Sequence, residues 1–345
     1  MSGGVDSSVA ALLLREQGYE VIGVSMSLYD ASQGERFGSC CSPRDLYDAR
    51  SVATALGLPF YALNMRETFA REVIADFVQE YRQGRTPNPC VRCNGQVKFG
   101  TLLRLARGLG AEHLATGHYA RVGTGPDGQR QLLRARDRRK YFLFMLGRPE
   151  LARALFPVGE LTKDEVRALA RRHGLRTADK PDSQEICFVP SGTHASFVAQ
   201  QDDQVPPGEI ADTAGTILGT HPGLPYFTVG QRRGLGLNGG TSYYVVRLEA
   251  ATNRVVVGRR EELFAAGLLA EPVSWVDPAE GETGGTYAVK IRYRHEEVPA
   301  EVRPEGPGRA VVRFGTPQRA VAPGQAVVFY DGERVAGGGW IARAL

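Results

Sequence analysis

The sequence lacks any apolar run long enough to cross a membrane, and it has no basic segment followed by an apolar stretch near its start. A spanning helix needs about 20 consecutive apolar residues, and a secretion signal places basic residues before a shorter apolar stretch. These two absences argue against a helical membrane protein and against a secreted one. We therefore expect a soluble, cytoplasmic protein with no membrane partner.

Lysine is scarce, because it supplies only 5 of the 42 basic side chains and arginine supplies the other 37. The net charge of +4 is small for 345 residues, which excludes a polybasic tail. Arginine pairs with phosphates through two hydrogen bonds and stacks on bases, so its surplus is compatible with an RNA partner. A genome rich in G and C produces the same bias, and the composition leaves both explanations open.

Cysteine is also rare, and its odd count of five argues against a framework of disulfides. In a reducing compartment, so few cysteines indicate metal binding, redox chemistry or nucleophilic attack. Cys40 and Cys41 are adjacent, Cys90 and Cys93 form a CxxC motif, and Cys187 stands far along the chain. We interpret Cys40 and Cys41 as structural, because they directly precede a predicted helix.

The first half of the chain alternates strand-like and helix-like segments. The predicted helices cover 6–17, 43–56, 66–82 and 162–173, and the predicted strands cover 20–25, 59–64 and 113–117. Strands separated by helices are typical of an α/β fold with a doubly wound, mainly parallel sheet.

The pattern changes after about residue 190. Turns rich in glycine and proline separate short runs such as SYYVVRLE, TYAVKIRYR and AVVFY. Runs rich in valine, tyrosine and threonine predict β-barrel-like domains. We therefore predict three domains, namely an α/β domain over 1–192, a small central domain over 193–265 and a C-terminal β-barrel over 266–345.

The chain opens with SGGVDSS, a glycine loop that leads into the first predicted helix. The backbone N–H groups of such a turn, together with the helix N-terminus, bind phosphates. Ser2, Ser7 and Ser8 add hydroxyl donors, and Asp6 can orient Mg²⁺ or its waters. The lysine of the GxxxxGK[ST] motif is absent, which excludes the loop that handles a γ-phosphate in many NTPases. A GxGxxG pattern at 234–239 lies in β-rich sequence, so it does not indicate a dinucleotide site.

Three kinds of chemistry fit Cys90, Cys93 and Cys187. Zinc is disfavoured, because the CxxC pair has no second pair and no histidine at ligand spacing. Three thiolates can hold a [4Fe–4S] cluster with one open iron. Two thiols can instead transfer sulfur, one as a persulfide and one as the attacking group, which is the interpretation that we prefer. We expect Cys93 to lie near the N-terminus of a helix starting at about residue 95, where the helix dipole lowers the pKa of a thiol.

The glycine loop resembles the PP-loop, SGGxDSS, of enzymes that cleave ATP between its α- and β-phosphates and leave an adenylated oxygen. Together with NPCVRCN, ATGHYAR, DSQEICF, GQRRGLG, IRYR and PGQAVVFY, it closely resembles the tRNA-specific 2-thiouridylase (tRNA-uridine 2-sulfurtransferase) family. The motifs follow the family's order from residue 1 to the C-terminus. The resemblance implies a PP-loop α/β domain followed by a central domain and a β-barrel.

The resemblance also implies a reaction on tRNA that uses ATP and Mg²⁺. ATP adenylates O2 of the wobble uridine with release of pyrophosphate, and sulfur from a cysteine persulfide displaces AMP to give 2-thiouridine. By motif, Cys187 bears the persulfide, and Cys93 is the nucleophile that closes a disulfide with Cys187 as sulfur leaves. A further implied partner is a persulfide sulfur donor, either a cysteine desulfurase or a sulfur-relay protein.

The family's binding residues carry over by motif. Nucleotide-binding positions are Met1, Ser2, Gly3, Gly4, Val5, Asp6, Ser7, Met26 and Gly117. Asn88, Pro89 and Cys90 face the target base, and the tRNA contacts are His118, Arg138, Arg139, Lys140, Arg292, Tyr293 and Gln325. Some relatives have aspartate in place of Cys90, and a thiol there strengthens the iron–sulfur alternative. Relatives also carry an apolar strand before the loop, so we expect the natural protein to begin upstream of Met1.

Two other functions explain part of the sequence. A PP-loop enzyme that amidates a small molecule accounts for SGGVDSS but gives no role to Cys93, Cys187 or the β-rich domains. The second alternative is a non-catalytic RNA-binding protein with a structural metal. Release of pyrophosphate from ATP that depends on added tRNA separates these functions from thiolation.

Overall fold

The computed structural model describes residues 1–29, 42–136, 143–181, 186–189, 194–201, 205–237, 242–293 and 295–345. The chain divides into two compact units. Unit 1 comprises Met1–Ile74, Cys90–Ser191 and Glu333–Val335, and unit 2 comprises Ala75–Pro89, Gly192–Gly332 and Ala336–Leu345. Among the helices in the described ranges, none is long and apolar enough to cross a membrane.

Unit 1 is an α/β unit. Its strands are β1 (Gly23–Ser27), β2 (Phe60–Asn64), β3 (Leu114–Ala115), β4 (Arg121–Thr124), β5 (Arg130–Leu133) and β6 (Ala154–Leu155). Its helices are α1 (Val5–Glu16), α2 (Pro43–Ala55), α3 (Arg66–Phe69), the π-helix η2 (Ala70–Ile74), α5 (Pro89–Arg92), the π-helix η3 (Cys93–Leu102), α6 (Leu103–Gly108), α7 (Arg148–Leu151) and α8 (Lys163–Arg172). β1 pairs with β2 and β3 with β6, both in parallel, and β4 and β5 form an antiparallel hairpin. The expected α/β class with parallel strands is confirmed.

Helix starts in unit 1 follow local signals in the sequence. Ser42 caps α2 and Thr162 caps α8, each in a reciprocal capping box with the residue three positions later. The core joins helices that are distant in sequence, because Val9 of α1, Val52 of α2 and Val166 of α8 lie in one buried cluster. Burying each of these side chains contributes about 1.5–3 kcal/mol. The core thereby holds α1, and with it the glycine loop, against the rest of the unit.

Three predicted elements are corrected by the structure. The strand expected over 20–25 is β1 and begins three residues later, at Gly23, where its pairing with Phe60 of β2 starts. The helix expected over 66–82 is present as α3, η2 and α4 (Ala75–Arg82), with a π-helical segment in its middle. The helix expected to start at about residue 95 starts at Pro89, and α5, η3 and α6 follow one another without a break.

Unit 2 contains α4 and two β-rich parts. The first part has the strands β7 (Gly208–Asp212), β8 (Ile217–His221), β9 (Tyr244–Glu249) and β10 (Arg254–Gly258), in the order β8–β7–β10–β9. It also has the helices α9 (His194–Gln201), η4 (Leu224–Tyr226), η5 (Ala250–Thr252) and η6 (Arg260–Leu263). Its own small core gathers buried side chains such as Ile210, Val245, Val255 and Phe227.

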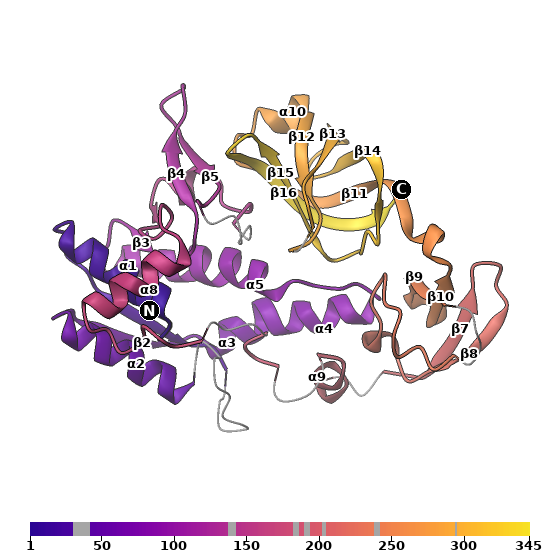
Figure 1. Ribbon diagram of the computed structural model, residues 1–345, viewed down its shortest axis with the longest axis horizontal. Coiled ribbons are helices and arrows are strands. Elements are labelled where there is room, and N and C mark those ends of the chain that lie inside the picture. Colours follow the sequence, from indigo (N-terminus) through magenta and orange to yellow (C-terminus); the bar gives the residue numbers. More distant parts are fainter. Residues whose placement is uncertain are drawn as a thin grey trace. The chain divides into compact units, whose positions relative to one another are not determined.

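The second part is a closed β-barrel (Figure 1). Its strands are β11 (Phe264–Trp275), β12 (Gly285–Lys290), β13 (Val298–Pro304), β14 (Ala310–Arg319), β15 (Ala326–Asp331) and β16 (Arg334–Ala344), with the short helix α10 (Glu280–Thr283) after β11. The order is β11–β14–β13–β12–β15–β16, and pairing of β11 with β16 closes the ring. Leu268, Val289, Phe329 and Ile341 fill its interior. The predicted C-terminal β-barrel is confirmed.

Candidate active site

The glycine loop lies directly before α1, whose N-cap is Gly4. Gly4 brings no side chain to cap the first N–H groups of the helix, and such groups together with the helix dipole favour an anion. Ser7 Oγ accepts from Ser2 N at 3.1 Å and donates to Gly4 O at 3.1 Å. Ser8 Oγ also donates to Gly4 O, at 2.9 Å. The serine hydroxyls therefore brace the turn and keep its shape.

Two glycines allow the backbone around the loop to pack closely. Gly3 has a φ of +69°, and a Cβ there would lie 2.2 Å from Asp45 O. A Cβ on Gly117 would lie 2.6 Å from Ser7 N and from the carbonyl carbon of Asp6. The structure thus places Gly117, which is 110 residues away in sequence from Ser7, directly against the first turn of α1.

The carboxylate of Asp6 is held by two donors. Tyr119 Oη donates to Asp6 Oδ1 at 2.8 Å, and Lys163 Nζ donates to the same oxygen at 2.7 Å. Lys163 is only 9% exposed, although lysine is almost never that buried unless it is paired. Its ammonium also lies 5.9 Å from the centre of the Tyr119 ring. Three segments that are far apart in sequence therefore meet at the glycine loop.

Tyr119 and Lys163 are site residues that the sequence analysis missed. Lys163 carries a signal in hindsight, because it is the first residue of α8, where the helix dipole disfavours a cation. A basic residue in that position needs an anionic partner from elsewhere. The only sequence signal for Tyr119 is its position within the ATGHYAR motif.

Three other predicted nucleotide-binding residues, Met1, Met26 and Val5, differ in what their main chains and side chains contact. Met1 donates its amino N–H to Val24 O, and Met26 lies in β1 opposite Leu63. The side chain of Val5 is buried in the core at 3% exposure, so only its backbone is left to meet a ligand.

The three described cysteines differ in exposure and are not joined in disulfides. Cys90 is exposed, Cys93 is buried at 9% exposure, and Cys187 is intermediate. Because the helix starts at Pro89, Cys90 lies in its first turn and Cys93 lies one turn further in. The expectation that Cys93 lies at the helix N-terminus is therefore wrong, and the dipole acts most strongly on Cys90.

The helix α3 contacts both of the segments that carry the cysteines predicted to react. Phe188, the neighbour of Cys187, is 5% exposed and packs edge-on against Phe69, with ring centres 5.5 Å apart. α3 also packs against η3, which begins at Cys93. The segments that carry Cys93 and Cys187 therefore share α3 as a neighbour.

Comparisons with known proteins agree along the whole chain. Residues 1–191 match the family model described as tRNA methyl transferase HUP domain, residues 195–259 match the tRNA methyl transferase PRC-barrel domain, and residues 265–341 match the aminomethyltransferase beta-barrel domain. The tRNA-specific 2-thiouridylase MnmA of Geobacter metallireducens is 54% identical over all of this chain and 96% of the relative. Those of Geotalea uraniireducens and Carboxydothermus hydrogenoformans are 51% and 48% identical, also over all of this chain, and 94% and 97% of each relative is covered.

The chain belongs to the tRNA-specific 2-thiouridylase family. The wording "methyl transferase" comes from the descriptions of the family models, whereas the three relatives all carry the thiouridylase name.

The residues that the thiouridylase motifs assign to tRNA fall in both units. In unit 1, His118 Nδ1 lies 2.8 Å from Thr116 Oγ1. In unit 2, Arg292 donates to Arg319 O at 2.9 Å, and Tyr293 is 44% exposed. Four more residues of this group lie in the described part of the chain. Asn88 is partly buried, Pro89 is buried and Cys90 is exposed, and the side-chain amide of Gln325 donates to Thr86 O at 2.7 Å.

Some predicted residues lie outside the described ranges. They are Cys40 and Cys41, the tRNA-contacting Arg138, Arg139 and Lys140, and the DSQE part of the motif before Cys187.

In the iron–sulfur alternative, Cys90, Cys93 and Cys187 would each bind a different iron of one cluster. In the described part of the chain, no group of three or more His, Cys, Asp or Glu side chains lies in an arrangement that can hold a single metal ion.

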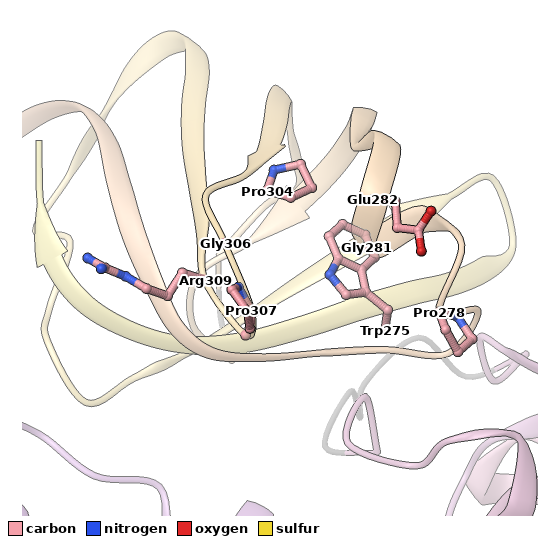
Figure 2. Close-up of a pocket in the computed structure, with 9 residues that line it drawn as sticks. Trp275, Pro278, Gly281, Glu282, Pro304, Gly306, Pro307 and Arg309 are labelled. Carbon is pink, nitrogen blue, oxygen red and sulfur yellow. The ribbon is translucent and has the colours of Figure 1, made fainter.

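A pocket of about 570 Å³ lies at one end of the barrel. Figure 2 shows Trp275, Pro304, Pro307 and Arg309 around it. The Trp275 ring also packs against the rings of the barrel core, 5.3 Å from that of Phe329. No predicted catalytic or binding residue lines this pocket, so it is separate from the nucleotide loop and the cysteines.

Proposed function

We propose that this chain uses ATP to exchange O2 of the wobble uridine of tRNA for sulfur, giving 2-thiouridine, AMP and pyrophosphate. The observation that carries this proposal is the likeness to thiouridylases over the full chain at 54% identity. The local geometry supports it, because an anion-binding loop and two candidate sulfur-transfer cysteines lie in one compact unit.

The first step is adenylation. The N–H groups at the start of α1 bind the phosphates of ATP, and Gly117 keeps the space beside that turn narrow. Lys163 supplies from α8 the cation that the SGGVDSS loop lacks, and Asp6 and Tyr119 hold it beside the loop. O2 of the uridine attacks the α-phosphorus, and pyrophosphate leaves as its charge is stabilised by these groups.

Asp6 also fits the magnesium ion that PP-loop enzymes use with ATP. Mg²⁺ in such sites is usually bound by one or two carboxylates together with substrate phosphates. Asp6 supplies a carboxylate at the phosphate-binding end of α1. When bound, the ion neutralises phosphate charge.

The second step transfers sulfur. The terminal sulfur of a persulfide on Cys187 attacks C2 of the activated uridine, and AMP leaves with the former O2. The thiolate of Cys93 then attacks Cys187 Sγ, which releases 2-thiouridine and closes a disulfide between the two cysteines. An external thiol must reduce this disulfide, and a persulfide donor, such as a cysteine desulfurase or a sulfur-relay protein, must reload Cys187.

The tRNA is bound by residues of both units in this proposal. The exposed ring of Tyr293 can stack on a base, and Arg292 and His118 lie at matching family positions. We keep the division into domains over 1–192, 193–265 and 266–345 as part of the proposal.

Mass spectrometry of the tRNA product tests the proposal. Wild-type protein with ATP, Mg²⁺ and a persulfide donor should produce tRNA with one oxygen-to-sulfur exchange at the wobble uridine. Cys93→Ser and Cys187→Ser should each abolish the exchange, while pyrophosphate release that depends on tRNA survives. A fully active Cys187→Ser variant would remove Cys187 from the reaction.

The iron–sulfur alternative has its own test. Protein purified without oxygen is analysed for iron and sulfide, and its thiolation rate is measured in parallel. Full activity without iron supports the persulfide route, whereas activity that rises in proportion to bound iron would replace it.

A further inference from the structure

The segment from Gly84 to Pro89, which leads directly into the cysteine-bearing helix, is held by other parts of unit 2. Gly84 ends the turn after α4 with a φ of +66°, and a Cβ there would lie 2.9 Å from Leu248 Cβ in β9. Two residues further on, the backbone of Thr86 is hydrogen-bonded to Pro323 and Gln325 of the barrel. The segment is therefore packed against both β-rich parts of unit 2.

Both backbone groups of Thr86 are bonded to the turn before β15. Thr86 N donates to Pro323 O at 2.8 Å, and the side-chain amide of Gln325 donates to Thr86 O at 2.7 Å. Gly324, between these two partners, has a φ of +86°, and a Cβ there would lie 2.8 Å from Thr86 N. Glycine is therefore required by the backbone conformation and by the close approach.

The turn that holds Thr86 is itself braced by the barrel. Gly324 N donates to Ile341 O at 2.8 Å, and Ile341 N donates to Gln325 O at 2.8 Å. Ile341 lies in β16 and is fully buried. These two hydrogen bonds therefore hold the turn against β16 of the barrel.

The segment beyond Thr86 is stiff. The sequence Thr-Pro-Asn-Pro contains two prolines, which fix their own φ and restrict the residue before each to extended conformations. Pro87 and Pro89 are both buried, and Pro89 is the first residue of α5. This stiff segment of unit 2 ends directly before Cys90, the first residue of the adjoining part of unit 1.

We infer that the barrel turn Ala322–Gln325 positions the cysteine-bearing helix, and that Gln325 acts through Thr86. This inference rests on the proposed function for its catalytic consequence. It gives Gln325 a different role from the tRNA contact that the sequence motif assigns.

Gln325→Glu and Gly324→Ala test this inference. The first change puts a carboxylate opposite the carbonyl of Thr86, and the second puts a methyl group against its N–H. The matched control is Gly306→Ala, because Gly306 has a φ of +88° in another turn of the same barrel and a Cβ there meets nothing within 4 Å. The control reports the cost of backbone strain alone.

The first measurement is the rate at which iodoacetamide alkylates Cys93, without tRNA or ATP. Trypsin cleaves after Arg92, so Cys90 and Cys93 fall in separate peptides and exposed Cys90 serves as internal reference. Both test variants should raise the rate at Cys93 about three- to tenfold, the factor expected for the loss of one hydrogen bond. Gly306→Ala should leave it unchanged.

The second measurement separates positioning from RNA binding. The test variants should bind tRNA with wild-type affinity and thiolate it at saturation about tenfold more slowly. The inference would be overturned if the alkylation rate of Cys93 were unchanged in both Gln325→Glu and Gly324→Ala. It would also be overturned if Gln325→Glu bound tRNA more weakly while its Cys93 was alkylated at the wild-type rate. Absence of thiolation by the wild type would refute the proposed function instead, and the alkylation result would still stand.

Discussion

Replacing Lys163 with methionine is expected to weaken ATP binding much more than adenosine binding. The Nζ of Lys163 lies 2.7 Å from Asp6 Oδ1, and the two side chains are only 11% and 19% exposed. A hydrogen bond to a charged group is worth about 1.5–3 kcal/mol. In the proposed ATP complex Lys163 makes one such bond to the phosphates, so its loss should raise the Kd for ATP about ten- to hundredfold.

The assay is calorimetric titration with adenosine, AMP and a non-cleavable ATP analogue, each with and without Mg²⁺. The loss should grow with the number of phosphates, because Lys163 acts on charge and not on the base or ribose. Lys163→Arg keeps the charge and should recover part of the affinity. Equal loss for all three ligands would refute the reasoning, as would an ATP affinity within about twofold of wild type.

The matched control for this series is Arg121→Met. Arg121 lies in the same unit and also makes a close ion pair, with Glu333 at 2.6 Å, but its partners Glu333, Glu160 and Arg134 O all lie outside the glycine loop. Its removal should leave the affinities for adenosine and ATP unchanged. The comparison separates general loss of an ion pair from loss of the cation at the loop.

Three further changes test other parts of the structure. Gly117→Ala places a Cβ 2.6 Å from the first turn of α1, so titration should show ATP affinity lowered at least about tenfold, and wild-type affinity would contradict this packing. Lys180→Met leaves Asp45 and Asp48, which are 4% and 5% exposed, without their shared ammonium at 2.6 and 2.7 Å. Urea unfolding should show a loss of about 3 kcal/mol, and a loss below about 1 kcal/mol would argue against a stabilising role. Burial lowers the pKa of His221, so its contribution to stability is complete above the unfolded-state pKa of about 6.5 and is lost as pH falls below it. The drop in unfolding free energy between about pH 7.5 and pH 5.5 should be smaller in His221→Gln than in wild type.

Predictions based on neighbouring residues were the most accurate. The predicted helices over 43–56 and 162–173 begin as expected, and each starts with a capping box, at Ser42 and at Thr162, that depends on contacts within three residues. The start of α5 was wrong by six residues, although Pro89 at its first position is a known helix-start signal that was overlooked. The start of β1 was also wrong, because a strand begins where it finds a partner, and that partner is β2.

The site was predicted only in part. The SGGVDSS loop could be recognised from seven adjacent residues, and Gly117 by its motif. Tyr119 and Lys163 lie 113 and 157 residues from Asp6, and no local pattern records which side chains meet across such separations. The motif assigns Gln325 to tRNA, which stays a prediction, and no local pattern records that its amide bonds to the backbone of Thr86.

The sequence by itself determined the glycine loop, the places of the cysteines, the α/β-then-β order and the likeness to thiouridylases. These features depend on residue order and on local backbone preference. Only the tertiary structure decided that a lysine from α8 neutralises Asp6, that Cys93 is buried one turn inside its helix, and that the barrel holds the segment before Cys90. Those contacts arise when distant segments share one core, and the pairing of such segments is decided by packing.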